Sequence, residues 1–315
     1  MADKKKIATR EAYGNALKEF GADKNIVVLD ADLSKSTKTD NFKKEYPERF
    51  INMGIAEANM ISTAAGLASC GKTVFASSFA MFAAGRAFEQ VRNSVCYPNL
   101  NVKVCATHAG ISVGEDGATH QSLEDLALMR SLPNMTVLSP CDALETKMAI
   151  KAAIDNYGPF YVRLGRLAVE EVNDEATYKF ELGKGVTLKE GSDVTLVATG
   201  LMVGEALKAH ELLKEEGISA RVINIHTIKP IDKDILEKAA KETGALVSCE
   251  EHTVMGGLGS AVAEVLCETY PAPLVRVGTL DVFGKSGTPK ELLEQYKLTA
   301  KDIKDAAKKS ISLKK

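Results

Sequence analysis

The chain has 315 residues, the length of about two domains, since one domain takes roughly 100 to 200 residues. Hydrophobic residues make up 45% and charged residues 26%, a composition that excludes disorder, fibrous repeats and small disulfide-stapled scaffolds. The 40 basic and 42 acidic residues leave a formal net charge of -2, which makes nucleic acid a poor first candidate for a partner.

No apolar run approaches the roughly 20 residues that cross a bilayer. The first residues, MADKKKIATREA, lack the apolar stretch of a signal peptide, so we expect a cytoplasmic protein with no membrane partner. The six cysteines show no CxxC pair and no zinc-ligand spacing. We therefore expect reduced and mostly buried thiols.

Short β-branched runs alternate with helical patterns along the chain, which indicates an α/β fold with mostly parallel sheets flanked by helices. The expected strands of the first part lie at 25–30, 73–77, 101–107, 135–139 and 160–164. The expected helices lie at 8–21, 55–70, 82–96, 121–131 and 142–156. Together these elements predict a first domain over residues 1–170.

A polar, highly charged stretch follows, and we interpret it as a linker over 171–190 with a hairpin. From 191 to 315 the alternation restarts and predicts a second, four-stranded α/β domain that ends in a C-terminal helix. Within it, the segment EEHTVMGGLGSAVAEVL predicts a strand, a glycine turn and a helix start. Because Glu250 and Glu251 argue against phosphate there, we assign this segment to packing or subunit contact.

Polar side chains gather just past the first predicted strand of the parallel sheet, in the motif DADLSKS. Ligands bind at the carboxyl ends of parallel strands, which favours a site that includes Asp30, Asp32, Ser34 and Ser36. The same residue types also cap helices and shape loops, and this segment taken alone favours that structural role.

Three residues suit either a structural role or the recognition of a nitrogen heterocycle. Glu57, in NMGIAEANM, starts a helix of small residues, where a carboxylate is favoured by the helix dipole. The alternative is a buried carboxylic acid that shares a proton with a nitrogen base. Phe79 and Phe82, in SSFAMFAAGR, have the spacing of core residues on a helix, but they also suit the walls around a flat heteroaromatic ring.

The densest polar cluster is THAGISVGEDGATHQSLED, which follows a predicted strand and holds two of the five histidines. His108, Glu115, Asp116, His120 and Gln121 lie there among three glycines, which permit unusual backbone angles and close ligand approach. A purely structural loop rarely needs this chemistry, so we expect a functional site. Its spacings fit no standard zinc site, whereas hydroxyl-bearing substrates use the same donors and acceptors.

Two arginines, Arg163 and Arg166 in YVRLGR, lie at the end of the last strand expected in the first domain. A guanidinium there suits a phosphate or a carboxylate, which it can bind in a bidentate manner. A salt bridge at a domain interface is the open alternative for both.

Taken in order, the motifs DADLSKS, GIAEANM, FAMFAAGRAFEQVR, THAGISVGEDGATHQSLED and YVRLGR give the chain a clear resemblance to transketolase. The resemblance covers the pyrimidine-binding and C-terminal domains of that family across nearly all of the sequence, and GEDGATHQ is its most specific part. The family's diphosphate-binding domain, with its GDG motif and a metal-binding Asn, is absent from the sequence. The chain therefore resembles the C-terminal subunit of a split, two-chain transketolase.

This resemblance implies thiamine diphosphate as cofactor, with Mg2+ held by a partner chain. It matches Glu57 to the glutamate that hydrogen-bonds N1′ of the cofactor's aminopyrimidine, which makes Glu57 catalytic as well as cofactor-binding. Phe79 and Phe82 match the aromatic pocket around that ring. Asp32 and Leu33 are expected as further cofactor-binding residues.

On the substrate side, Asp116 and His120 match the residues that contact the donor's hydroxyl groups and support proton transfer. The residues expected at the phosphate end are Ser36, His108, Arg163 and Arg166. The sequence departs from the family pattern at Gly85, where some relatives have an aromatic residue, and at Ala109 and Gly165. These departures leave the sugar preference less defined than the reaction type.

The implied reaction is transfer of a two-carbon ketol unit from a ketose phosphate such as xylulose 5-phosphate to an aldose phosphate such as ribose 5-phosphate, as in the pentose phosphate pathway. We expect activity only with an N-terminal partner subunit, in a heterodimer that pairs into a heterotetramer. The alternatives are deoxyxylulose-phosphate synthase, a transketolase specialised for another pentose, and a non-catalytic assembly subunit. The β subunit of 2-oxoacid dehydrogenases fits less well, because its histidine loop has a different pattern.

Overall fold

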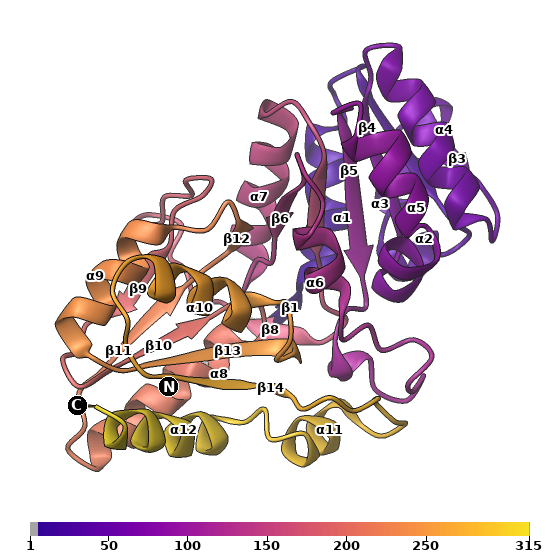
Figure 1. Ribbon diagram of the computed structural model, residues 1–315. Coiled ribbons are helices and arrows are strands. Elements are labelled where there is room, and N and C mark those ends of the chain that lie inside the picture. The colour runs from indigo at the N-terminus through magenta and orange to yellow at the C-terminus, as the bar shows by residue number, and fades with distance from the viewer. Residues whose placement is uncertain (1–5, 315) are drawn as a thin grey trace.

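The structure, a computed structural model, describes residues 6–314. Two α/β domains lie side by side, the first drawn in indigo to magenta and the second in orange to yellow (Figure 1). Each has its own sheet flanked by helices, so the expected α/β class is confirmed. No described helix has both the length and the apolar character that a membrane span requires.

The first domain is built on a seven-stranded sheet with the order β12-β6-β7-β5-β4-β2-β3. Six of its strands pair in parallel, namely β2 (Ile26–Asp30), β3 (Phe50–Asn52), β4 (Thr73–Phe79), β5 (Val102–Thr107), β6 (Thr136–Leu138) and β7 (Phe160–Arg163). Every residue of β2, β5 and β7 is buried, because helices cover both faces of the sheet. This explains the continuous apolar runs that predicted these strands.

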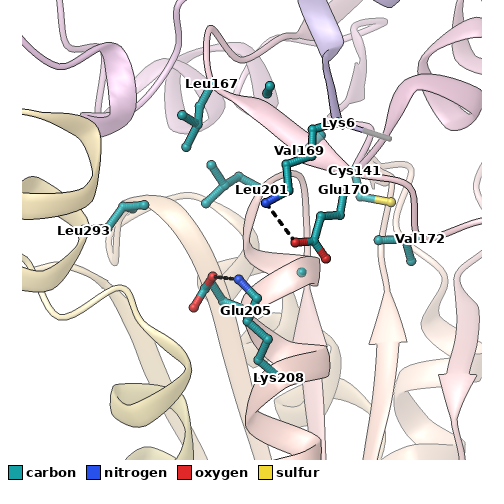
Figure 2. A pocket seen from close by; sticks show the side chains of 12 residues that line it. Lys6, Cys141, Leu167, Val169, Glu170, Val172, Leu201, Glu205, Lys208 and Leu293 are labelled. Carbon is teal, nitrogen blue, oxygen red and sulfur yellow. Dashed lines mark hydrogen bonds and ion pairs between the residues drawn. The ribbon is translucent and has the colours of Figure 1, made fainter. Parts of the chain in front are cut away.

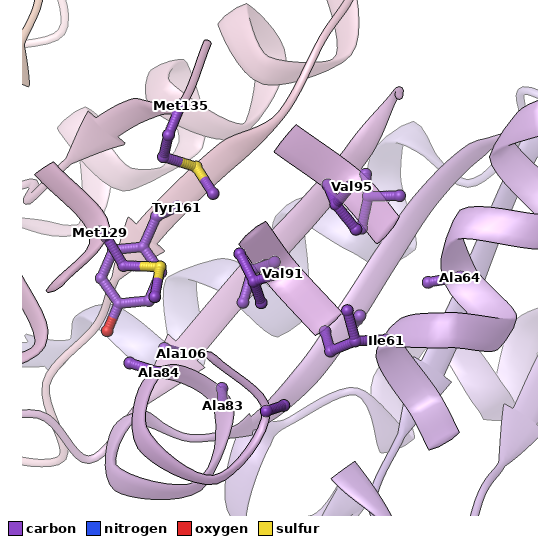
Figure 3. Packing of buried hydrophobic residues seen from close by; sticks show 14 of the residues in the cluster. Ile61, Ala64, Ala83, Ala84, Val91, Val95, Ala106, Met129, Met135 and Tyr161 are labelled. Atoms are coloured by element: carbon purple, nitrogen blue, oxygen red, sulfur yellow. The ribbon is translucent and has the colours of Figure 1, made fainter. Parts of the chain in front are cut away.

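Helices cover both faces of this sheet. On one face, α1 (Thr9–Phe20) packs against α7 (Ala143–Asp155). On the other face lie α4 (Glu57–Ser69), the helical stretch 81–96 and α6 (Asp125–Arg130). Figure 3 shows Ala64, Ala83 and Ala84 in this core beside Ile61 and Val91; such small side chains let helices approach the strands closely.

Three expected helices follow the sequence pattern and two differ in detail. The stretch 81–96 is helical, but it consists of two π-helical turns, η2 (Met81–Arg86) and η3 (Val91–Cys96), around α5 (Phe88–Gln90). The helix expected at 121–131 begins only at Asp125. Residues 121–124 instead belong to the loop over 108–124 that carries His108 and His120, called the histidine loop below. Two short helices, α2 (Ser34–Thr37) and α3 (Asp40–Glu45), a single turn η1 (Pro47–Arg49) and η4 (Ile111–Val113) complete the domain.

The prediction of a hairpin in the polar stretch is wrong. Its two strands, β8 (Ala168–Glu170) and β9 (Val186–Lys189), do not pair with each other. Strand β8 pairs antiparallel with β1 (Lys6–Ala8), and β9 pairs antiparallel with β11 (Ala220–Asn224). Both strands find partners elsewhere in the chain, a choice that local sequence does not encode.

The second sheet has five strands in the order β14-β13-β10-β11-β9, so the expected count of four is wrong. The four expected strands are present and parallel: β10 (Val194–Ala198), β11, β13 (Leu246–Thr253) and β14 (Leu274–Thr279). The fifth is the antiparallel edge strand β9. The helices around this sheet are α8 (Met202–Glu215), α9 (Lys233–Thr243), α10 (Leu258–Glu268), α11 (Pro289–Gln295) and the C-terminal α12 (Ala300–Ser312).

The two domains are tied together through several elements. Strand β12 (Thr227–Lys229) leaves the second domain and pairs antiparallel with β6 of the first sheet. The segment after β13 packs on α6, where His252 Nε2 accepts from the backbone N–H of Ala127 and Arg130 donates to the carbonyl of Gly256. Glu250 accepts the N–H groups of Leu258 and Gly259 and so caps α10 from within the chain. The packing role assigned to this segment is confirmed.

Candidate active site

The candidate site lies at the carboxyl ends of β2, β4 and β5, three neighbouring parallel strands of the first sheet. Each strand is followed by a segment that carries polar or aromatic side chains, at residues 30–36, 79–86 and 107–121. Parallel strands end at one edge of a sheet, and this is where open α/β sheets bind ligands. The topology therefore brings together most of the residues that the sequence singled out.

Glu57 is the first residue of α4 and is only 2% exposed. Both of its carboxylate oxygens accept hydrogen bonds from Nη1 of Arg86, at 2.9 and 3.1 Å. The Arg86 side chain is itself 52% exposed and lies over the ring of Phe82, 4.5 Å from its centroid. A buried carboxylate thus lies beside an aromatic face, which are the two surfaces that an aminopyrimidine ring requires.

Four rings form one cluster beside this carboxylate. Phe79 and Phe82 are stacked with centroids 6.1 Å apart, and His108 stacks on Phe79 at 3.8 Å. His120 meets Phe82 edge-on at 5.3 Å. Phe79 is the last residue of β4 and Phe82 lies in η2, so the two do not share the helical turn that their spacing suggested. Both rings nevertheless lie against His120.

His108 lies in a cationic environment. Its Nε2 is 3.1 Å from Nη1 of Arg10, and the same Arg10 atom donates to the backbone carbonyl of Ser36 at 3.0 Å. Burial, together with the charges of Arg10 and Arg166, lowers the pKa of His108 to about 3. A neutral imidazole and two guanidinium groups suit an anionic ligand group such as a phosphate.

Arg166 is half-buried and holds the histidine loop from outside. Its Nη1 donates to the carbonyl of Val113 and pairs with Glu115 at 2.9 Å. Asp116 is exposed on the same loop, and His120, partly buried, has Nδ1 2.9 Å from the hydroxyl of Thr119. Both side chains therefore remain accessible to a ligand at the open edge of the site.

In the DADLSKS segment, Asp30 has a structural role, whereas the side chains of residues 32–36 are exposed or partly exposed. Asp30 is fully buried and accepts from the N–H of Leu33 and from the hydroxyls of Thr37 and Thr39. This is the loop-shaping role that the motif allowed, and burial raises the pKa of Asp30. Asp32 is exposed with φ 64° and accepts from Asn52, while Ser34, Leu33 and Ser36 are partly exposed.

Arg163 is not part of this open edge. It is 7% exposed, and its guanidinium pairs with the buried carboxylate of Asp125 and donates to the carbonyl of Glu251. The ion pair lies within the first domain, and only the hydrogen bond to Glu251 crosses to the second, so the interface salt bridge that the sequence left open is not the contact that forms. The buried pairing leaves no free face for a substrate phosphate. Glu251 in turn accepts from the N–H of Ser112, so the second domain supports the base of the histidine loop.

Gln121 supports the same loop from its other end. Its buried amide donates to the carbonyls of Ile111, Gly114 and Lys285. The chain at Gly284 approaches so closely that a Cβ there would lie 1.8 Å from Gln121 Oε1. The histidine loop is therefore held between the first sheet and the second domain, with α11 packed against η4.

A separate cavity of about 260 Å³ lies between the domains (Figure 2). Apolar side chains such as Leu167, Leu201 and Leu293 line it, and none of the site residues described above does. Lys6 pairs with Glu170 at its edge, and Lys208 pairs with Glu205. All six cysteines are free, four of them buried as expected, and Cys141 lines this cavity.

Sequence reasoning missed Arg10 and Arg86 at the site, and it assigned Glu251 to packing without linking it to the histidine loop. Arg10 lies on α1, Arg86 is 29 positions from its partner Glu57, and Glu251 comes from the second domain. No local pattern marks them, because each acts through a contact that forms only on folding. Among residues 6–314, no group of three or more histidine, cysteine, aspartate or glutamate side chains is arranged to hold a metal ion.

The site defines a class: a two-domain α/β protein that presents a buried carboxylate, an aromatic face and a cationic end at one sheet edge. Residues 5–171 match the family described as "Transketolase, pyrimidine binding domain", and residues 183–303 match "Transketolase, C-terminal domain". The chain belongs to the transketolase family, a family of transferases, as the earlier resemblance predicted.

Several of the proteins to which this chain is similar have nearly the same length, whereas it spans about half of others, such as the transketolase of Homo sapiens. A putative transketolase C-terminal section from Methanocaldococcus jannaschii is 54% identical over 299 residues, 93% of each chain. A 6-deoxy-6-sulfo-D-fructose transketolase subunit from Clostridium sp. (strain MSTE9) is 46% identical and covers 95% of this chain and 92% of its own. A solved structure described as "Split gene transketolase, inactive beta4 tetramer" is 58% identical, with a TM-score of 0.92, and covers 98% of this chain and all of its own.

Proposed function

We propose that this chain is the pyrimidine-binding subunit of a two-chain transketolase that moves a two-carbon ketol unit between sugar phosphates. The donor would be a ketose phosphate such as xylulose 5-phosphate and the acceptor an aldose phosphate such as ribose 5-phosphate. The observation that carries the proposal is the buried Glu57 carboxylate beside the ring of Phe82, with a cationic pocket at His108 on the same edge.

The residues present fit the aminopyrimidine end of thiamine diphosphate. When bound, this cofactor supplies the carbon nucleophile and the electron sink for breaking and making the carbon–carbon bond. Glu57 would hold a proton on the N1′ atom of the pyrimidine, a role that its burial favours because few other partners reach it. Phe79 and Phe82 would bind the ring, and Asp32 and Leu33, just after the end of β2, would border it.

The cationic end would hold the phosphate of the sugar. Arg10, His108 and Arg166 supply donors there, with Ser36 beside them. We leave Arg163 out of this set, because Asp125 occupies its guanidinium. Asp116 and His120, at the exposed loop, would contact the sugar hydroxyls and move protons at the reacting carbons.

A partner subunit would complete the site. The cofactor's diphosphate and Mg2+ need ligands, and the described residues of this chain offer no metal cluster. Two of the similar proteins are described as a C-terminal section and as a subunit, which supports an N-terminal partner chain. The similar split-gene structure is described as a tetramer of one kind of chain, and we propose that with the partner the assembly becomes a heterotetramer. In such an assembly, the accessible edge with Asp116, His120 and Phe82 would face the partner's cofactor ligands.

The test is a tagged purification from native extract, followed by an assay for sedoheptulose 7-phosphate from the two pentose phosphates with thiamine diphosphate and Mg2+. We expect activity in the complex with a co-purifying chain and a loss of about 100-fold or more in Glu57→Gln. Glu89→Gln, a change at an exposed glutamate of the neighbouring helical stretch, is the matched control. Full activity of the Glu57→Gln complex would refute the catalytic proposal and favour an assembly role.

A second sugar pair has its own support. The 46% identical relative is described as acting on 6-deoxy-6-sulfo-D-fructose, whose sulfonate is an anion like a phosphate. The pocket of Arg10, His108 and Arg166 suits either anion. Assaying both donors with the same complex decides between them through the ratio of their kcat/KM values.

A further inference from the structure

Arg86 occupies the surfaces that the proposed site needs for its ring. Its Nη1 donates to both oxygens of Glu57, and its guanidinium covers the ring of Phe82 at 4.5 Å. No other hydrogen-bond partner of the Glu57 side chain is found within the described part of the chain. One side chain therefore holds both the carboxylate and the aromatic face.

Apart from the Phe82 face that Arg86 covers, the ring cluster has little aromatic surface on which a flat heterocycle could stack. Phe79 already has His108 stacked on it at 3.8 Å, and the centroids of Phe79 and Phe82 are 6.1 Å apart. Inserting a third ring between two stacked rings requires roughly 7 Å, because carbon atoms in contact lie about 3.5 Å apart. An incoming ring would therefore use the Phe82 surface that Arg86 now covers.

We propose that Arg86 is a displaceable internal competitor, which holds Glu57 and Phe82 in the free subunit and leaves when the aminopyrimidine binds. This inference rests on the proposed function, because it concerns the ring that the same site would bind. The pairing is physically reasonable in the free subunit, since a buried carboxylate without a cationic or donor partner is costly.

Displacement is feasible because the two partners differ in exposure. The Glu57 carboxylate is 2% exposed and fixed on α4, whereas the Arg86 side chain is 52% exposed at the end of η2. The guanidinium can regain water when it leaves, while Glu57 cannot. The bound ring would then replace both contacts of Arg86 with a hydrogen bond and a stacked face.

The experiment measures equilibrium binding of thiamine diphosphate, with Mg2+, to the purified two-chain complex by titration calorimetry. Arg86→Met keeps an unbranched side chain and removes the charge, and Arg86→Lys keeps a charge without the planar group. Arg92→Met, at an exposed arginine of η3 that contacts Asn93, is the matched control. Thermal unfolding of each complex verifies that the variants are folded.

We expect Arg86→Met to bind thiamine diphosphate about tenfold more tightly than wild type, a difference of about 1.4 kcal/mol. Arg86→Lys should fall between the two, and Arg92→Met should match wild type. Weaker or unchanged binding in Arg86→Met would overturn the inference, since a structural or ring-holding role of Arg86 predicts a loss of affinity. Failure of the wild-type complex to bind the cofactor at all would overturn the proposed function as well.

Discussion

The buried ion pair between Arg163 and Asp125 is expected to be a main contribution to the stability of the first domain. Asp125 is fully buried and accepts from Arg163 Nε at 2.8 Å, from Arg163 Nη2 at 3.2 Å and from the hydroxyl of Tyr161 at 2.7 Å. In Arg163→Met, that carboxylate keeps only the Tyr161 donor. Removing one partner of a buried pair costs about 3 to 5 kcal/mol, so we expect a loss of this size in the free energy of unfolding.

The assay is urea unfolding followed by circular dichroism, because the chain has no tryptophan for fluorescence. The double variant Asp125→Asn/Arg163→Met removes both charges, and it should recover at least half of the loss because no unpaired charge remains. A loss below about 1 kcal/mol in Arg163→Met, or a double variant as unstable as the single one, would refute this reasoning.

The same pair predicts a pH dependence. Burial works against ionisation of Asp125, but the charge of Arg163 and the hydrogen bonds outweigh it, so its pKa lies below the ordinary value of 3.8. The pair's contribution to stability is therefore present above this ordinary value and is lost as the pH falls through the lower, folded-state pKa. The difference in the free energy of unfolding between wild type and Arg163→Met should accordingly become smaller at low pH, because the unpaired buried carboxylate of the variant accepts a proton readily.

Two further predictions concern the histidine loop. Folding lowers the pKa of His108 from its ordinary value of 6.5 to about 3, so the side chain should stay neutral from pH 8 to about 4. The contribution of neutral His108 to the free energy of unfolding is therefore fully present above pH 6.5 and is lost as the pH falls toward 3. NMR of labelled histidines, with His108→Gln to assign the signal, tests this; a midpoint near 6.5 would contradict it. Gly284→Ala, with its Cβ 1.8 Å from Gln121 Oε1, should destabilise by about 1 to 3 kcal/mol in urea unfolding. The control is Gly204→Ala, inside α8 with nothing within 4 Å of the added Cβ, which should stabilise the protein by about 0.5 to 1 kcal/mol. Equal effects of the two glycine substitutions on the free energy of unfolding would disprove the close-contact argument.

Periodicity predicted most of the secondary structure because strand and helix patterns are local. The strands β2, β4, β5 and β10 and the helices α1, α4 and α7 lie where the apolar runs placed them. The errors arose where a segment's partner is distant. Strand β9 was not expected in the second sheet, since it is only four residues long, buries none of them fully, and has its partner β11 more than thirty residues away along the chain.

The motifs also predicted which residues gather at this sheet edge, because the segments that follow neighbouring parallel strands come together at their carboxyl ends. Glu57, Phe79, Phe82, His108 and His120 meet in the structure, as expected from their places in the motifs. The motifs did not separate Arg163 from Arg166, although the two differ in burial. An odd offset of three along an extended segment turns side chains in different directions, and what each meets depends on the neighbouring domain.

The α/β class, the order of the main elements, the family and the loop that carries the polar side chains could thus all be predicted from the sequence. All of these depend on residue types and spacings within short segments. Three pairings became visible only in the folded chain: Arg86 with Glu57, Arg10 with His108, and Arg163 with Asp125. Charged side chains choose partners by proximity after folding, and burial then decides whether the contact is structural or remains available to a ligand.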